Sequence, residues 1–154
     1  MGAIHANEFT ECLYKEIGLL KYLRDNSLEY SDDKTERQYT IFSRCSNPIV
    51  NFRARPLPGC CGVLVVYYLR PTQTKNSLKV FRATLSLIVK AAGKAKFGLV
   101  ILSQTINSPI YDILKNAHLT TQFTNWKTKN QVGIFTIKTT YKEKKIARKV
   151  FDGE

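Results

Sequence analysis

Two apolar runs separated by one amphipathic helical pattern constrain the fold of this chain more than any other feature. VLVVYYL (63–69) and GLVILSQ (98–104) are largely aliphatic and aromatic, as expected of strands buried on both faces. Between them, residues 77–92 carry apolar side chains at helical spacing, with Ser77 placed to cap the start and Gly93 to end the helix. This order predicts a right-handed βαβ unit with two parallel strands. The apolar stripe of the helix consists of Leu78, Phe81, Leu85, Ile88 and Ala92.

Further helices and strands are predicted around this unit. Two hairpins are predicted from four β-rich segments, because apolar and polar residues alternate in them and short connections separate the members of each pair. The pairs are 37–45 with 49–57, and 119–126 with 132–141. Residues 7–26 have the periodicity of an amphipathic helix, with Phe9, Leu13 and Ile17 on its apolar stripe. The polar segment 27–36 is predicted to be a loop or a short second helix. The fold class is therefore α/β, with a mixed twisted sheet of about six strands and flanking helices.

Length and composition favour one folded domain. The chain has 154 residues, 44% of them hydrophobic, enough for a single core, so we predict one α/β domain over residues 1–154. No apolar run is long enough to span a bilayer, and the N-terminus lacks the order of a secretory signal. The four cysteines and two histidines lack the spacing of a zinc site, so no metal is expected.

Charge is distributed unevenly along the sequence. The formal net charge is +12, but residues 1–36 form an acidic segment and residues 141–154 a basic tail. No Asp or Glu occurs between Arg37 and Tyr111, a stretch that contains eleven Lys and Arg residues. Such a field favours an anionic partner, and nucleic acid is one candidate. The predicted nucleic-acid contacts are Arg53, Arg55, Arg70, Lys144, Lys145 and Arg148.

The order of elements over residues 37–140 resembles the C-terminal two thirds of a GNAT-type N-acetyltransferase. The most specific part is NSPIYDILKNAHLTTQF, in which Asn107 matches an Asn of the family and Ser108 and Pro109 open a short helix. The resemblance implies a splayed parallel pair, with an acyl-CoA arm in the gap and pyrophosphate on the N-terminus of the long helix. The implied acyl-CoA site consists of Leu69, Gln73, Lys75, Asn76, Ser77 and Asn107.

Three departures from the family pattern favour a protein without catalysis. Leu114 occupies the position at which the family has a tyrosine that acts as general acid. Asn76 and Leu78 stand at small-residue positions of the phosphate-binding turn, where bulk hinders approach of a pyrophosphate. The strands of the central sheet contain no carboxylate to act as general base. We therefore expect no catalytic residue and no bound cofactor, with acetyl-CoA as the ligand if the chain is an enzyme after all.

A narrower resemblance covers residues 107–137. This run is similar to a GNAT-like internal virion protein of short-tailed phages, which implies a structural or interaction protein near packaged DNA. The implied partners are other virion proteins or nucleic acid, the implied location is the virion or the host cytoplasm, and no membrane is expected. Two alternatives stay open: an acyl-CoA-dependent N-acetyltransferase with an atypical phosphate turn, and a basic nucleic-acid-binding α/β protein. AGKAKFGLVIL, which resembles a segment of small RNA-binding ribosomal proteins, supports the latter.

Overall fold

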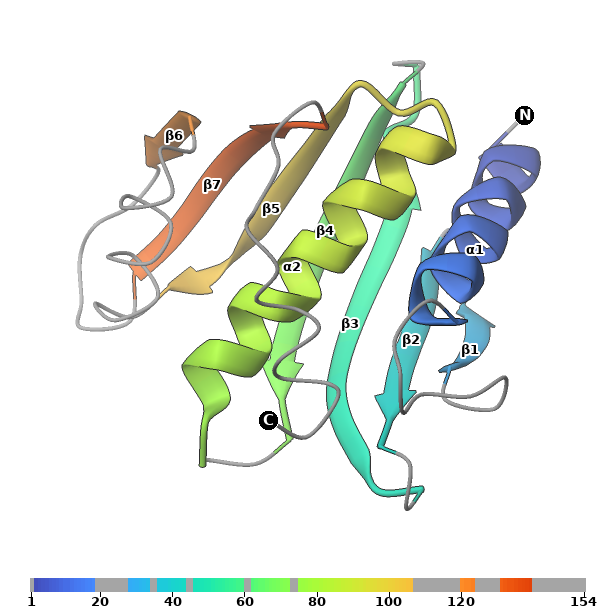
Figure 1. Cartoon of the computed structure of the whole chain (residues 1–154). Coiled ribbons are helices and arrows are strands. Elements are labelled where there is room, and N and C mark those ends of the chain that lie inside the picture. The colour runs from blue at the N-terminus through green and yellow to red at the C-terminus, as the bar shows by residue number, and fades with distance from the viewer. Residues whose placement is uncertain are drawn as a thin grey trace.

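A seven-stranded sheet with two helices on one face forms the body of the protein (Figure 1). The computed structural model describes residues 2–18, 28–33, 36–43, 46–59, 62–72, 75–106, 120–123 and 131–139. Its elements are α1 (Gly2–Gly18), β1 (Leu28–Asp33), β2 (Glu36–Phe42), β3 (Pro48–Pro56), β4 (Val63–Pro71), α2 (Ser77–Lys94), β5 (Leu99–Ile106), β6 (Thr120–Phe123) and β7 (Gln131–Lys138). The strand order is β1-β2-β3-β4-β5-β7-β6. The sheet is mixed, because β4 and β5 are parallel whereas the other described pairs are antiparallel.

These elements confirm the α/β class, the βαβ unit and both hairpins. The sheet has one strand more than the sequence suggested, because residues 28–33 form β1 instead of a loop or short helix. Of its side chains from Leu28 to Asp32, only Leu28 is buried, so β1 lacks the apolar alternation from which strands are predicted. The backbone of β1 pairs with β2 over its whole length. Its backbone groups therefore have hydrogen-bond partners that could not be predicted from the side-chain pattern.

The start of α2 differs from the prediction. The N-cap is Asn76 and not Ser77, and Asn76 lies in the left-handed region with φ of 58° and makes no side-chain capping hydrogen bond. Leu78 is 39% exposed and so does not belong to the buried stripe that includes Phe81 and Leu85. The buried face of α2 begins about one turn into the helix, at Phe81, and Leu78 precedes that point.

The end of α2 is a Schellman motif two residues beyond the predicted stop. Gly93 lies inside the helix, which continues to Lys94, and Lys96 takes the left-handed conformation with φ of 68°. The amide of Phe97 donates to the carbonyl of Ala92 at 2.9 Å, and that of Lys96 to Gly93 at 3.1 Å. A lysine therefore takes the place that glycine usually occupies after a helix.

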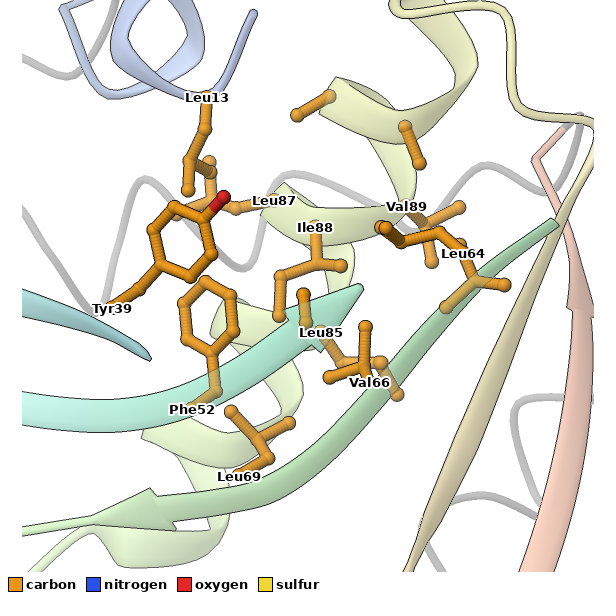
Figure 2. Packing of buried hydrophobic residues seen from close by; sticks show 14 of the residues in the cluster. Leu13, Tyr39, Phe52, Leu64, Val66, Leu69, Leu85, Leu87, Ile88 and Val89 are labelled. Atoms are coloured by element: carbon orange, nitrogen blue, oxygen red, sulfur yellow. The ribbon is translucent and has the colours of Figure 1, made fainter. Parts of the chain in front are cut away.

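The hydrophobic core lies between the two helices and the face of the sheet that they cover. Figure 2 shows Tyr39 stacked on Phe52, with Leu85 and Ile88 of α2 facing β4. The ring centroids of Tyr39 and Phe52 are 4.9 Å apart, and Phe9 of α1 packs edge-on against Tyr39 at 5.7 Å. α1 begins at Gly2, before the predicted start, and Phe9, Leu13 and Ile17 of the predicted stripe are buried; residues 19–26 of the predicted helix lie outside the described residues.

Polar contacts fix α1 onto the sheet and onto α2. Arg37, which is buried on β2, donates to the hydroxyl of Thr10 at 2.9 Å and to the side-chain oxygen of Asn7 at 2.6 Å. Its Nε donates to Asp32 of β1 at 2.5 Å. On the other side of α1, the buried Glu16 forms an ion pair with Lys94 of α2.

Candidate functional site

β4 and β5 part from each other shortly after they pair. Their ladder contains four residue pairs, from Val63 opposite Leu99 to Val66 opposite Leu102. β4 nevertheless continues to Pro71 and β5 to Ile106, and the two strands diverge toward their carboxyl ends (Figure 1). Beyond Val66, the backbone groups of β4 that face β5 are not paired with that strand. The sequence predicted a splayed central pair, and the structure confirms it.

A β-bulge begins two residues after Val66, the last residue of β4 that pairs with β5. Arg53 of β3 pairs with Tyr67, but Asn51 pairs with Arg70, so the single residue between them on β3 faces two residues on β4. The first of these, Tyr68, has φ of 53°, in the left-handed region that tyrosine rarely adopts. A bulge bends the strand that carries it and increases the local twist. This bend turns β4 away from β5.

The N-terminus of α2 follows the diverging end of β4 and is suited to an anion. The first turn contains no acidic residue, and Asn76 leaves the first amides without a side-chain cap. Lys75 and Lys79 are both exposed at this end, although the positive end of the helix dipole disfavours cations. A bound anion would remove that conflict, and backbone amides at a helix N-terminus are good phosphate ligands.

The residues of the implied acyl-CoA site have different positions relative to this end. Lys75, Asn76 and Ser77 lie together at the start of α2. Leu69 is 2% exposed and packs in the core, so its side chain does not reach a ligand at this end. Gln73, Asn107 and Leu114 lie outside the described residues.

The predicted basic residues of the sheet lie on the face opposite the helices. Arg53 and Arg55 alternate with the buried Phe52 and Ala54 along β3, as the sequence indicated. Arg70 shares their face, because it pairs with Asn51. The remaining predicted contacts, Lys144, Lys145 and Arg148, lie outside the described part of the chain.

Tyr68 forms one cluster with Arg53 and Arg70. The guanidinium carbons of Arg53 and Arg70 each lie over the Tyr68 ring, 5.3 Å from its centroid. Tyr68 is 50% exposed, and its ring meets that of Tyr67 edge-on at 5.4 Å. Neither ring belongs to the core cluster, because the bulge turns Tyr68 outward.

A carboxylate that the sequence did not single out completes the cluster. Glu36, the first residue of β2, accepts a hydrogen bond from Arg53 at 2.6 Å, and its side chain is 14% exposed. The contact was not predicted, because residues 27–36 were expected to form a loop or short helix and Glu36 was therefore not placed beside β3.

Within the described ranges, no group of acidic, histidine and cysteine side chains could hold a metal ion. Neither described helix is long and apolar enough to cross a membrane.

Comparison with solved structures identifies the fold. A protein assigned to the GNAT acetyltransferase family from Desulfovibrio desulfuricans superposes with a TM-score of 0.55 and 12% identity, covering 68% of this chain and 70% of that chain. A spermidine N-acetyltransferase variant from Vibrio cholerae gives a TM-score of 0.54 at 10% identity, with 70% of this chain and 67% of that chain covered. A protein described as an acyl-CoA N-acyltransferase from Klebsiella pneumoniae gives 0.52 at 9% identity, over 89% of this chain and 88% of that chain.

Sequence comparison adds no closer relative. No family model matches the chain, and no curated protein matches it. The likeness to the solved structures therefore rests on the arrangement of strands and helices, at identities that establish a fold and not an activity. The chain has the fold of the GNAT-type acetyltransferases, with the parted parallel strands and the bulged strand described above.

Proposed function

We propose that this protein binds an acyl-CoA between β4 and β5 and transfers its acyl group to an amine, as an acyl-CoA-dependent N-acetyltransferase with an atypical phosphate turn. The observation that carries the proposal is the early parting of the two strands, whose pairing ends at Val66 and Leu102. An extended chain with amide groups, such as the pantetheine arm of coenzyme A, can pair with strand backbone that has lost its neighbour. The proteins with which the fold is shared are named as transferases, which favours this alternative over a purely structural role.

The start of α2 provides the charge for the phosphate end of such a ligand. Its uncapped amides and the exposed Lys75 and Lys79 are donors suited to a pyrophosphate. Leu78 stands where the family has a small residue, and its half-exposed side chain restricts the approach of phosphate to the first turn. We therefore expect weaker coenzyme A binding than a glycine-rich turn gives.

The acyl-CoA supplies an activated thioester, and the chain has to position an amine against it. The amine nitrogen forms a bond to the acyl carbon, the carbon–sulfur bond breaks, and the proton that leaves nitrogen ends on the sulfur. β3, β4 and β5 contain no Asp or Glu, so the sheet beside the thioester holds no carboxylate to take up that proton. Acceptors that are already partly unprotonated at neutral pH are therefore favoured.

Calorimetric titration with acetyl-CoA tests the proposal. We expect heat of binding that weakens at high salt, because phosphate contacts of exposed lysines are screened. Lys75→Ala should weaken binding about threefold to fivefold, as expected for one exposed charge contact worth roughly 1 kcal/mol. Lys90→Ala is the matched control, because Lys90 is an exposed lysine of the same helix far from its N-terminus.

The opposite result would favour the structural role predicted from the sequence. If the protein binds no acetyl-CoA at millimolar concentration, the transferase proposal is refuted. A non-catalytic role in a virus particle then predicts that the chain is present in purified particles. Release of coenzyme A thiol in the presence of amines, measured with a thiol-reactive dye, separates a working enzyme from a protein that only binds acyl-CoA.

A further inference from the structure

We infer that the amine acceptor carries a carboxylate, and that Arg70, held against Tyr68 beside Arg53, binds it. The inference rests on the proposed transferase function, and it names the class of acceptor as an amino acid or an acidic peptide with a free α-amino group. It follows from the geometry of the cluster, from its charge and from its place beside the parted strands.

The geometry holds two guanidinium groups in a fixed relation. Each lies 5.3 Å from the centroid of the Tyr68 ring, one from β3 and one from β4. The left-handed backbone of Tyr68 at the bulge fixes where that ring stands, and the edge-on contact with Tyr67 supports it. A cation over an aromatic face is oriented before any ligand arrives, which lowers the entropic cost of binding an anion.

The charge of the cluster leaves an anion to be bound. Glu36 accepts a hydrogen bond from Arg53, so one positive charge is already compensated. Arg70 is exposed, and within the described part of the chain it forms no ion pair with an acidic side chain. Arg55 on the same face has a buried Nε without a hydrogen-bond partner among the described residues. A planar guanidinium donates two parallel hydrogen bonds to a carboxylate, which makes Arg70 the natural ligand for that group.

The cluster also lies beside the place where the acyl group is expected. Tyr68 and Arg70 follow Val66, the last residue of β4 that pairs with β5, by two and four positions. Ala54 of β3 pairs with Val66 and Asn51 with Arg70, so Arg70 lies three residue steps of β3, or about 10 Å at about 3.3 Å per residue, from the point of parting. A carboxylate bound at Arg70 therefore leaves the amine of a small acceptor within reach of a thioester between the strands.

Two other classes of acceptor fit the cluster less well. A polyamine such as spermidine would meet like charge, since Glu36 is already paired with Arg53 and residues 37–111 contain no acidic residue. A nucleobase would have to stack on Tyr68, but guanidinium groups already lie over that ring. The α-amino group of a peptide, with a pKa of about 8, also has a far larger neutral fraction at pH 7 than an alkyl amine of about 10.4, so it needs less help from a general base.

A matched pair of dipeptides tests the inference. Glycyl-aspartate and glycyl-asparagine, both with an amidated C-terminus, have the same amine and almost the same shape, and only the first of them carries a carboxylate. In the wild-type protein with acetyl-CoA, we expect kcat/KM for glycyl-aspartate to exceed that for glycyl-asparagine by about tenfold to a hundredfold, the usual range for a charge-assisted hydrogen-bonded pair. Arg70→Gln should remove most of that preference while the affinity for acetyl-CoA stays the same. Lys138→Gln, which removes an exposed cation from β7, should preserve it.

Direct binding separates the two proposals from each other. Titration of glycyl-aspartate alone should give an affinity that Arg70→Gln weakens and Lys138→Gln does not. If this binding is present but acetyl-CoA does not bind, the transferase function is refuted and the carboxylate site stands. Equal reaction and equal binding of the two dipeptides, or faster reaction of spermidine, would overturn the inference even if acetyl-CoA binds.

Discussion

Replacing Arg37 by methionine should destabilise the protein by about 2–4 kcal/mol, because this buried arginine connects α1 to the sheet. Its side chain is 11% exposed, and it donates to Thr10 and Asn7 at 2.9 and 2.6 Å. Methionine fills much of the same volume without donating a hydrogen bond. The loss therefore measures chiefly the two contacts to α1, at roughly 1–2 kcal/mol each, because the Thr10 hydroxyl keeps its hydrogen bond to Tyr39 and Asn7 is exposed to water.

The contact of Arg37 with Asp32 should contribute much less. Asp32 is 65% exposed, so its ion pair is screened by solvent, and Asp32→Asn should cost less than about 1 kcal/mol. Burial alone lowers the pKa of Arg37, but its hydrogen bond to Asp32 and nearby charges more than offset this effect and raise the pKa overall. The Arg37 guanidinium of the wild type, with which both variants are compared, is therefore charged. A change in its protonation does not contribute to the measured differences in stability.

Urea unfolding followed by circular dichroism measures both variants. For a chain of this size, a loss of about 3 kcal/mol lowers the thermal midpoint by about 6–12 °C, which a parallel thermal scan resolves. Arg37→Lys should fall between the two variants, because lysine keeps the charge but cannot donate from three nitrogens at once. If Arg37→Met is as stable as the wild type, or if Asp32→Asn costs as much as Arg37→Met, the assignment of α1 docking to the contacts of Arg37 with Thr10 and Asn7 is wrong.

Two further predictions concern the ends of α2 and its contact with α1. Lys96→Gly should stabilise the protein by about 0.5–1 kcal/mol, seen as a higher urea midpoint, because glycine adopts a φ of 68° without steric cost; no change or a loss would contradict the Schellman geometry. The hydrogen bond and charge of Glu16 raise the pKa of Lys94. This pair therefore stabilises the folded state fully at pH values below the ordinary lysine pKa of about 10.4. The stabilisation is lost as the pH rises through the higher pKa that Lys94 has in the folded state. The urea midpoint should therefore fall more between pH 9 and 11.5 in the wild type than in Glu16→Gln, and parallel curves would show that the pair, in which Lys94 is largely exposed, adds nothing measurable.

The parts of the fold that the sequence predicts are those with a strong periodic pattern. The two apolar runs and the helix between them predicted the βαβ unit correctly, but not burial on both faces: both helices cover the same face, and Tyr67, Leu99 and Ile101 on the other face are only partly buried. β1 was missed because LEYSDD buries only Leu28 among its described side chains, so its strand character comes from pairing with β2. Leu78 was assigned to the wrong environment because helical periodicity does not show where the buried face of a helix begins.

The candidate site was predicted in part. Charge along β3 placed Arg53 and Arg55 on one face, since alternation in a strand is strict. The bulge could not be foreseen, because its left-handed residue is Tyr68 and not the glycine or asparagine that usually marks such a backbone. The cluster of Tyr68, Arg53 and Arg70 depends on that bulge, and it therefore had no signal in the sequence.

The short ladder between β4 and β5 also divides the sheet mechanically. Four residue pairs join the antiparallel plate of β1 to β4 to the plate formed by β5, β7 and β6, whereas β5 and β7 are joined by eight. Rotation of one plate against the other meets least resistance at this narrow seam, and α2 is the described element that spans it. A molecule bound where the strands part would contact both parts of the sheet. It would fix the angle between them and make the whole protein more rigid.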